Sequence, residues 1–105
     1  MTFEEIKSIL ESSTWKWHGK TTYKFTILSD LNGVLTGNMD DNTENKTRYT
    51  FELGEHGIFR FKGANPFAGE GRVFKIQFET NVIRLMLQAI GTAELDPYPI
   101  RLERV

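Results

Sequence analysis

The chain has 105 residues, of which 39% are hydrophobic and 12% aromatic, and its formal net charge is −1. This length predicts one domain spanning residues 1–105, and the balanced charges exclude the dominant basic face that nucleic-acid binding needs. Because the chain has no cysteine, a disulfide and a thiolate metal site are excluded as well.

The first residues do not predict a signal peptide, since they include Glu4 and Glu5 and lack a continuous apolar stretch. No segment approaches the roughly 20 apolar residues that a membrane-spanning helix requires. Together with the lack of cysteine, these observations predict a cytoplasmic protein without a membrane span.

A short amphipathic helix is predicted at the start of the chain. Thr2 and Glu5 fit a capping box, in which each side chain accepts a hydrogen bond from the other residue's backbone N–H. One stripe of this helix is apolar and consists of Phe3, Ile6, Ile9 and Leu10. A lone helix of this length is marginal in water. We therefore expect it to dock over the mouth of a barrel or the seam between two sheets.

From Trp15 to the end, apolar residues recur at every second position, which is the pattern of strands with one buried face. The strongest hairpin signal is Asn32-Gly33, because both residues tolerate positive φ. Short connections imply antiparallel neighbours. The expected fold is mainly β: a short N-terminal helix followed by an antiparallel up-and-down meander of about seven or eight strands that closes into a small barrel.

Two loops separate the predicted strands. The polar loop 40–47 is acidic but lacks the Gly and Glu that the EF-hand pattern places at its sixth and twelfth positions, so we expect a solvated loop. The loop 63–71 contains glycines and one apolar residue, Phe67. That residue either plugs an end of the barrel or offers a contact to a partner.

The sequence contains two histidines. His18 follows Trp17 and should point to the outer face, and His56 lies in a predicted tight turn next to Glu55. Neither residue has the spacing of a metal-binding or catalytic motif, and the glutamates within the strands fall on outer faces by alternation. We therefore expect no catalysis, no metal site and no cofactor.

Residues Ser13-Thr14-Trp15-Lys16-Trp17 resemble the start of the lipocalin-like, or calycin, proteins. Those proteins begin with a short helix and Gly-x-Trp on the first strand, and often end in a strand whose arginine covers that tryptophan. Here the closing segment 100–105 matches in position, and Ser13 stands where the family has glycine. The resemblance implies a closed barrel whose first and last strands are neighbours, and alternation favours Arg104 as the arginine over Trp15 or Trp17.

The aromatic side chains predicted to face inward form the candidate ligand-binding site. They are Trp15, Trp17, Tyr23, Phe25, Tyr49, Phe51, Phe59, Phe61, Phe74 and Phe78. Such an interior is either a plain core or the lining of a pocket for a small hydrophobic ligand. The leading hypothesis is a non-catalytic barrel that binds such a ligand. The alternative is a protein partner, bound by an inhibitor or immunity-type module through an exposed sheet edge or the 40–47 and 63–71 loops.

Overall fold

The computed structural model describes residues 1–17 and 19–105 and begins with helix α1 (Phe3–Glu11). The predicted capping box is confirmed. The Glu5 backbone N–H donates to Thr2 Oγ1 at 3.1 Å, and the Thr2 N–H donates to Glu5 Oε1 at 3.2 Å. The hydrogen bonds from Thr2 hold the pKa of the Glu5 carboxyl below its usual value. Ser12 caps the C-terminal end of the helix, and its N–H and hydroxyl both donate to the Ile9 carbonyl.

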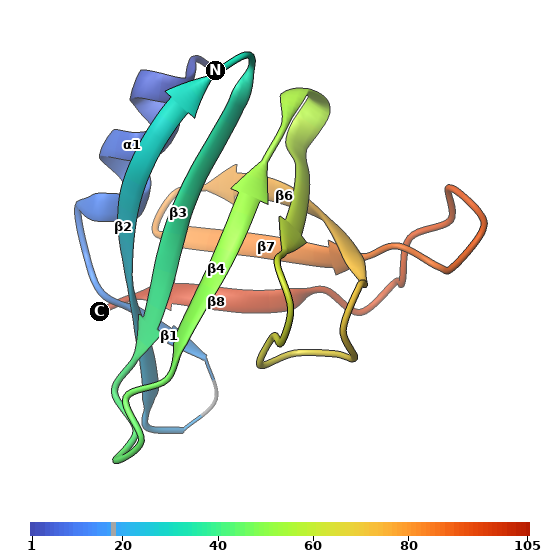
Figure 1. The fold of residues 1–105 in the computed structure, drawn as a ribbon. Helices are drawn as coiled ribbons and strands as arrows, with labels where there is room; N and C mark the ends of the chain where they lie inside the picture. The colour runs from blue at the N-terminus through green and yellow to red at the C-terminus, as the bar shows by residue number, and fades with distance from the viewer. Residues whose placement is uncertain (18) are drawn as a thin grey trace.

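In the described part of the chain, eight strands follow the helix. They are β1 (Trp15–Trp17), β2 (Thr21–Leu31), β3 (Val34–Asp41), β4 (Arg48–Leu53), β5 (Ile58–Phe61), β6 (Val73–Glu79), β7 (Val82–Leu87) and β8 (Ile100–Arg104). A short 3-10 turn, η1 (Glu55–Gly57), joins β4 to β5. Consecutive strands pair antiparallel and β8 returns to pair with β1 (Figure 1), so the predicted closed up-and-down barrel is confirmed.

The strands β2, β3 and β4 run side by side on one side of the barrel, whereas β6, β7 and β8 run across them (Figure 1). Helix α1 lies beside β2 and is tied to it at an irregularity in the β2–β3 register between Ile27 and Ser29. The Ile27 N–H donates there to Glu11 Oε2 at 2.9 Å. The helix is therefore docked on the barrel through a specific polar contact as well as through its buried stripe.

The two ends of the chain meet at Trp15 and Arg104, which are opposite one another in the β1–β8 pairing. The Arg104 guanidinium lies 4.8 Å from the centre of the Trp15 ring, so the predicted cation–π contact is confirmed. Arg104 also donates to Ser12 Oγ at 2.7 Å and to Asn81 Oδ1 at 3.1 Å. Trp15 Nε1 donates to the Leu10 carbonyl at 3.1 Å. This cluster joins the helix, the first strand and the last strand.

The connections confirm one prediction and correct another. Asn32 and Gly33 have φ of 57° and 75°, as the predicted hairpin requires. Strand β3 runs to Asp41, so the polar loop begins later than predicted. Each described strand has two neighbours in the closed barrel, but β1 pairs only with Thr21–Tyr23 of β2, so the predicted exposed sheet edge stays a prediction. The prediction for His18 lies outside the described residues.

Among the described residues, no helix combines the length and apolarity needed to cross a membrane.

Candidate functional site

The ten predicted aromatic residues lie mostly in the barrel interior. Those that are buried are Trp15, Tyr23, Phe25, Phe51, Phe59, Phe61 and Phe74, and those that are half-buried are Trp17, Tyr49 and Phe78. Burial also raises the pKa of the Tyr23 hydroxyl to about 12, with smaller contributions from the nearby Tyr49 and Asp41. The inward alternation of the strands is therefore as predicted.

The interior aromatics pack against one another. Phe51 and Phe59 stack with ring centres 4.9 Å apart, Phe59 and Phe61 meet edge to face at 5.1 Å, and Phe61 and Phe74 do so at 6.0 Å. Separations of this kind are those of favourable aromatic pairs. The side chains at this level of the barrel therefore contact one another.

A glycine makes room for this packing. Gly37 lies opposite Phe51 in the β3–β4 pairing. A Cβ atom at Gly37 would lie 2.6 Å from the Thr26 carbonyl oxygen and 2.9 Å from the Phe51 ring. Only a residue without a side chain fits at this position, and no pattern in the sequence had indicated it.

One end of the barrel is plugged by Phe67, from the loop between β5 and β6. Its ring centre lies 4.8 Å from that of Trp17, 5.8 Å from Tyr23 and 6.2 Å from Phe74. Asn65 Oδ1 shapes this loop by accepting the Phe67 N–H at 2.8 Å. Of the two alternatives for Phe67, the plug is therefore confirmed.

The polar loop has an internal organisation of its own. Asp41 Oδ1 accepts hydrogen bonds from the N–H and hydroxyl of Thr43, at 3.1 and 2.8 Å, and from the Thr47 N–H at 3.0 Å. The carboxylate therefore orders the turn, as expected for a solvated loop. The described residues include no group of three or more His, Cys, Asp or Glu side chains that could hold a metal ion.

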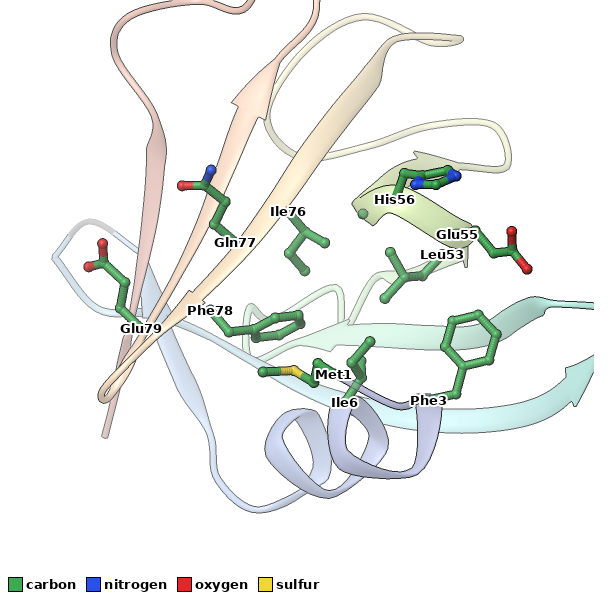
Figure 2. Close-up of a pocket in the computed structure, with 12 residues that line it drawn as sticks. Met1, Phe3, Ile6, Leu53, Glu55, His56, Ile76, Gln77, Phe78 and Glu79 are labelled. Carbon is green, nitrogen blue, oxygen red and sulfur yellow. The ribbon is translucent and has the colours of Figure 1, made fainter.

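An open cleft of about 760 Å³ lies at the other end of the barrel, between α1, η1 and β6. We call it the helix-side cleft. Its apolar lining consists of Met1, Phe3, Ile6, Leu53, Ile76 and Phe78. Figure 2 shows these side chains pointing toward one another from the helix and from the facing strands. The arrangement creates a hydrocarbon-walled groove.

Local structure explains why these residues meet. Ile6 belongs to the buried stripe of α1, Leu53 ends β4, and Ile76 and Phe78 share the inner face of β6. The turn η1 packs closely on β6, because a Cβ atom at Gly57 would lie 3.1 Å from the Ile76 carbonyl oxygen. Gly57 has a φ of 76°, a conformation that favours glycine. The turn thereby forms one wall of the cleft.

The polar residues of the cleft lie at its rim. They are Glu55, His56, Gln77 and Glu79, and Figure 2 shows their side chains pointing away from the apolar centre. Glu79 Oε2 lies 3.3 Å from Arg84 Nε. His56 is exposed and has a φ of 64°, which fits the predicted tight turn. The cleft can thus hold the apolar part of a ligand and leave the polar group of that ligand at the rim.

The helix-side cleft and the predicted aromatic site overlap at Phe78. Phe25 and Trp17 border two smaller hollows, and the buried aromatics belong to the core. Sequence reasoning missed the cleft because its lining comes from three separate segments. The available signal was the apolar stripe of the helix, whose Phe3 and Ile6 had to face something. That the predicted aromatics bind a ligand stays a prediction.

Comparisons with protein-family models, curated proteins and solved structures found no match to this chain. The class of this protein is therefore described from its fold alone. The described residues form a short helix and an eight-stranded antiparallel barrel with a buried aromatic cluster, an arrangement compatible with a calycin-like fold.

Proposed function

We propose that this protein is a non-catalytic, lipocalin-like β-barrel that binds a small apolar ligand in the helix-side cleft. The observation that carries the proposal is the convergence of six apolar side chains around a space of about 760 Å³. Small-molecule sites typically measure about 300–1,000 Å³ and combine apolar walls with a few polar groups. The cleft has this size and this composition.

The interior of the barrel is the less favourable position for a ligand. Phe51, Phe59 and Phe61 contact one another there and are buried. A ligand would have to separate these rings and lose their mutual contacts, each worth about 0.5–1.5 kcal/mol beyond area burial. In the helix-side cleft, a ligand covers Phe3 and Phe78, which are already half-exposed. The gain from burying apolar surface therefore favours the cleft.

Absence of catalysis is part of the proposal. The groups that point into the cleft are hydrocarbon side chains and the thioether of Met1. Such groups neither donate nor accept a proton in a general acid–base step. The matching expectation is that a bound ligand is recovered with its mass unchanged.

The test uses Nile red, a neutral apolar dye whose fluorescence rises on binding. We expect the full chain to bind it with a micromolar Kd, and Phe3→Ala to weaken binding because it removes a wall of the cleft. Tyr98→Ala is the matched control, since it truncates an aromatic side chain that is 83% exposed outside the cleft. No binding by the full chain, or equal affinity for both variants, would contradict the proposal.

A second candidate, a protein-binding module, is favoured by the loop between β7 and β8. Ile90 and Tyr98 are 81% and 83% exposed there. The loop is nevertheless ordered, because the Ala89 N–H donates to Glu94 O at 2.8 Å and the Asp96 N–H donates to Leu87 O at 2.8 Å. Native mass spectrometry separates the candidates. A small-molecule adduct supports the cleft, whereas an oligomer that Tyr98→Ser dissociates supports the loop.

A further inference from the structure

The charged side chains that line the helix-side cleft are both acidic. They are Glu55 and Glu79, and in the part of the chain that the structure describes, no lysine or arginine side chain joins them in the lining. Glu79 is partly neutralised by Arg84 at 3.3 Å. Glu55 is exposed and makes no ion pair with another described residue. A negative charge is therefore left at the rim beside η1.

Two cationic groups of the described residues lie near the cleft, and neither forms an ion pair with Glu55. The amino group of Met1 lies near enough to Glu5 to help lower the pKa of that carboxyl, so a carboxylate of α1 offsets part of its charge. Lys75 lies close to Gly57, because a Cβ atom added to Gly57 would lie 3.8 Å from Lys75 Cε. Lys75 is not one of the residues that line the cleft. A ligand carboxylate would thus meet Glu55 without a lysine or arginine side chain among the described lining residues to bind it.

We propose that the helix-side cleft takes an apolar amine, with its hydrocarbon part among the six apolar side chains and its ammonium group at the rim near Glu55. This inference rests on the proposed function and adds the charge of the ligand to it. Attraction to Glu55 favours an ammonium head over a hydroxyl, and repulsion disfavours a carboxylate.

The experiment compares octylamine, 1-octanol and octanoate as competitors of Nile red at neutral pH and low salt. The three share one alkyl chain and differ in the charge of the head group. We expect affinity to fall in that order, with the amine favoured over the acid by roughly five- to tenfold, the size of effect that exposed charges produce. Added salt should shrink this ratio and leave 1-octanol unchanged.

Glu55→Gln tests the residue itself and should bring the amine-to-acid ratio close to one. Glu44→Gln is the matched control: it removes the same charge from an exposed residue in the loop between β3 and β4, outside the cleft, and should preserve the ratio. Equal binding of amine and acid by the full chain, or a ratio that Glu55→Gln does not change, would overturn the inference while 1-octanol binding upholds the proposed function. Failure of all three competitors and of Nile red would overturn both.

Discussion

The two ends of this barrel are closed in different ways. At one end, the loop between β5 and β6 inserts the single ring of Phe67, which meets Trp17, Tyr23, Phe61 and Phe74. At the other end, helix α1 covers the opening with Ile6 and Leu10 but leaves the helix-side cleft beside it. One side chain closes the plugged end, whereas the helix leaves open space beside it.

The difference follows from the shapes of the two covers. A helix is a rod about 10 Å across whose side chains project at fixed angles. Its C-terminal part is fastened by Leu10, Glu11 and Ser12, through bonds to Trp15, Ile27 and Arg104. Its N-terminal part, with Phe3, spans the gap between β6 and η1. The helix-side cleft is the space that remains between this part of the helix, β6 and η1.

The largest expected effect is the loss of the plug. Phe67→Ala should lower the free energy of unfolding by about 3 kcal/mol, because it removes a ring with several aromatic partners. Phe3→Ala, the same truncation at the open end, should cost about 1 kcal/mol, since Phe3 is half-buried like Phe67 but borders the open cleft instead of a cluster of aromatic rings. Urea denaturation measures both. Equal losses would show that the two ends are packed alike.

A pair of glycine substitutions tests how tightly the barrel interior is packed between its two ends. Gly37→Ala should destabilise by about 1–3 kcal/mol, because the new methyl group collides with the Thr26 carbonyl and the Phe51 ring. Gly69→Ala places the same group in open space and should be nearly neutral. Thermal unfolding of the two variants tests the pair. A neutral Gly37→Ala would mean that Phe51 can move away and that the interior is looser than described.

The anchor of the helix is tested at Arg104. Arg104→Ala should destabilise by about 0.5–2 kcal/mol, because it removes the cation over Trp15 and the bond to Ser12 at the end of α1. Arg101→Ala, on the outer face of the same strand, loses an exposed pair with Glu103 and should have little effect. Chemical denaturation with tryptophan emission follows both variants. Similar small losses of stability in the two variants would show that Arg104 does not anchor the helix.

The smallest expected effect is a pH dependence at the plugged end. The pKa of Tyr23 is raised to about 12 by burial, whereas an unfolded tyrosine ionises near 10. Between these values the unfolded chain releases a proton that the folded chain keeps, so stability should fall as pH rises from about 10 to about 12. Tyr23→Phe should reduce that fall. Urea midpoints across this range measure it, and an unchanged slope in Tyr23→Phe would contradict the raised pKa.

Much of the fold could be predicted because it depends on local rules. Alternation places Trp15, Tyr23 and Phe51 on the inner face, and two residues with positive φ define the turn at Asn32-Gly33. Closure of the barrel could be predicted as well, since the first and last strands of an up-and-down meander can pair with one another. The position of Arg104 over Trp15 then follows from the parity of the last strand.

The candidate site could not be predicted in the same way, because it depends on how elements pack rather than on any single element. The cleft exists through the angle at which α1 meets the barrel end, which brings Phe3 opposite Phe78. Whether the interior is filled depends on side-chain volumes in three dimensions, as with Gly37 beside Phe51. The extended run of β3 to Asp41 was missed because its end is polar and alternation is weak there.

NMR contacts between a bound apolar ligand and the methyl groups of the protein show directly whether the ligand occupies the helix-side cleft. With 1-octanol bound, we expect intermolecular NOEs to Ile6, Leu53 and Ile76, which line the helix-side cleft. Leu35 and Leu102, buried in the core, should give none. NOEs to Leu35 and Leu102 without NOEs to Ile6 and Ile76 would place the ligand inside the barrel and contradict the account.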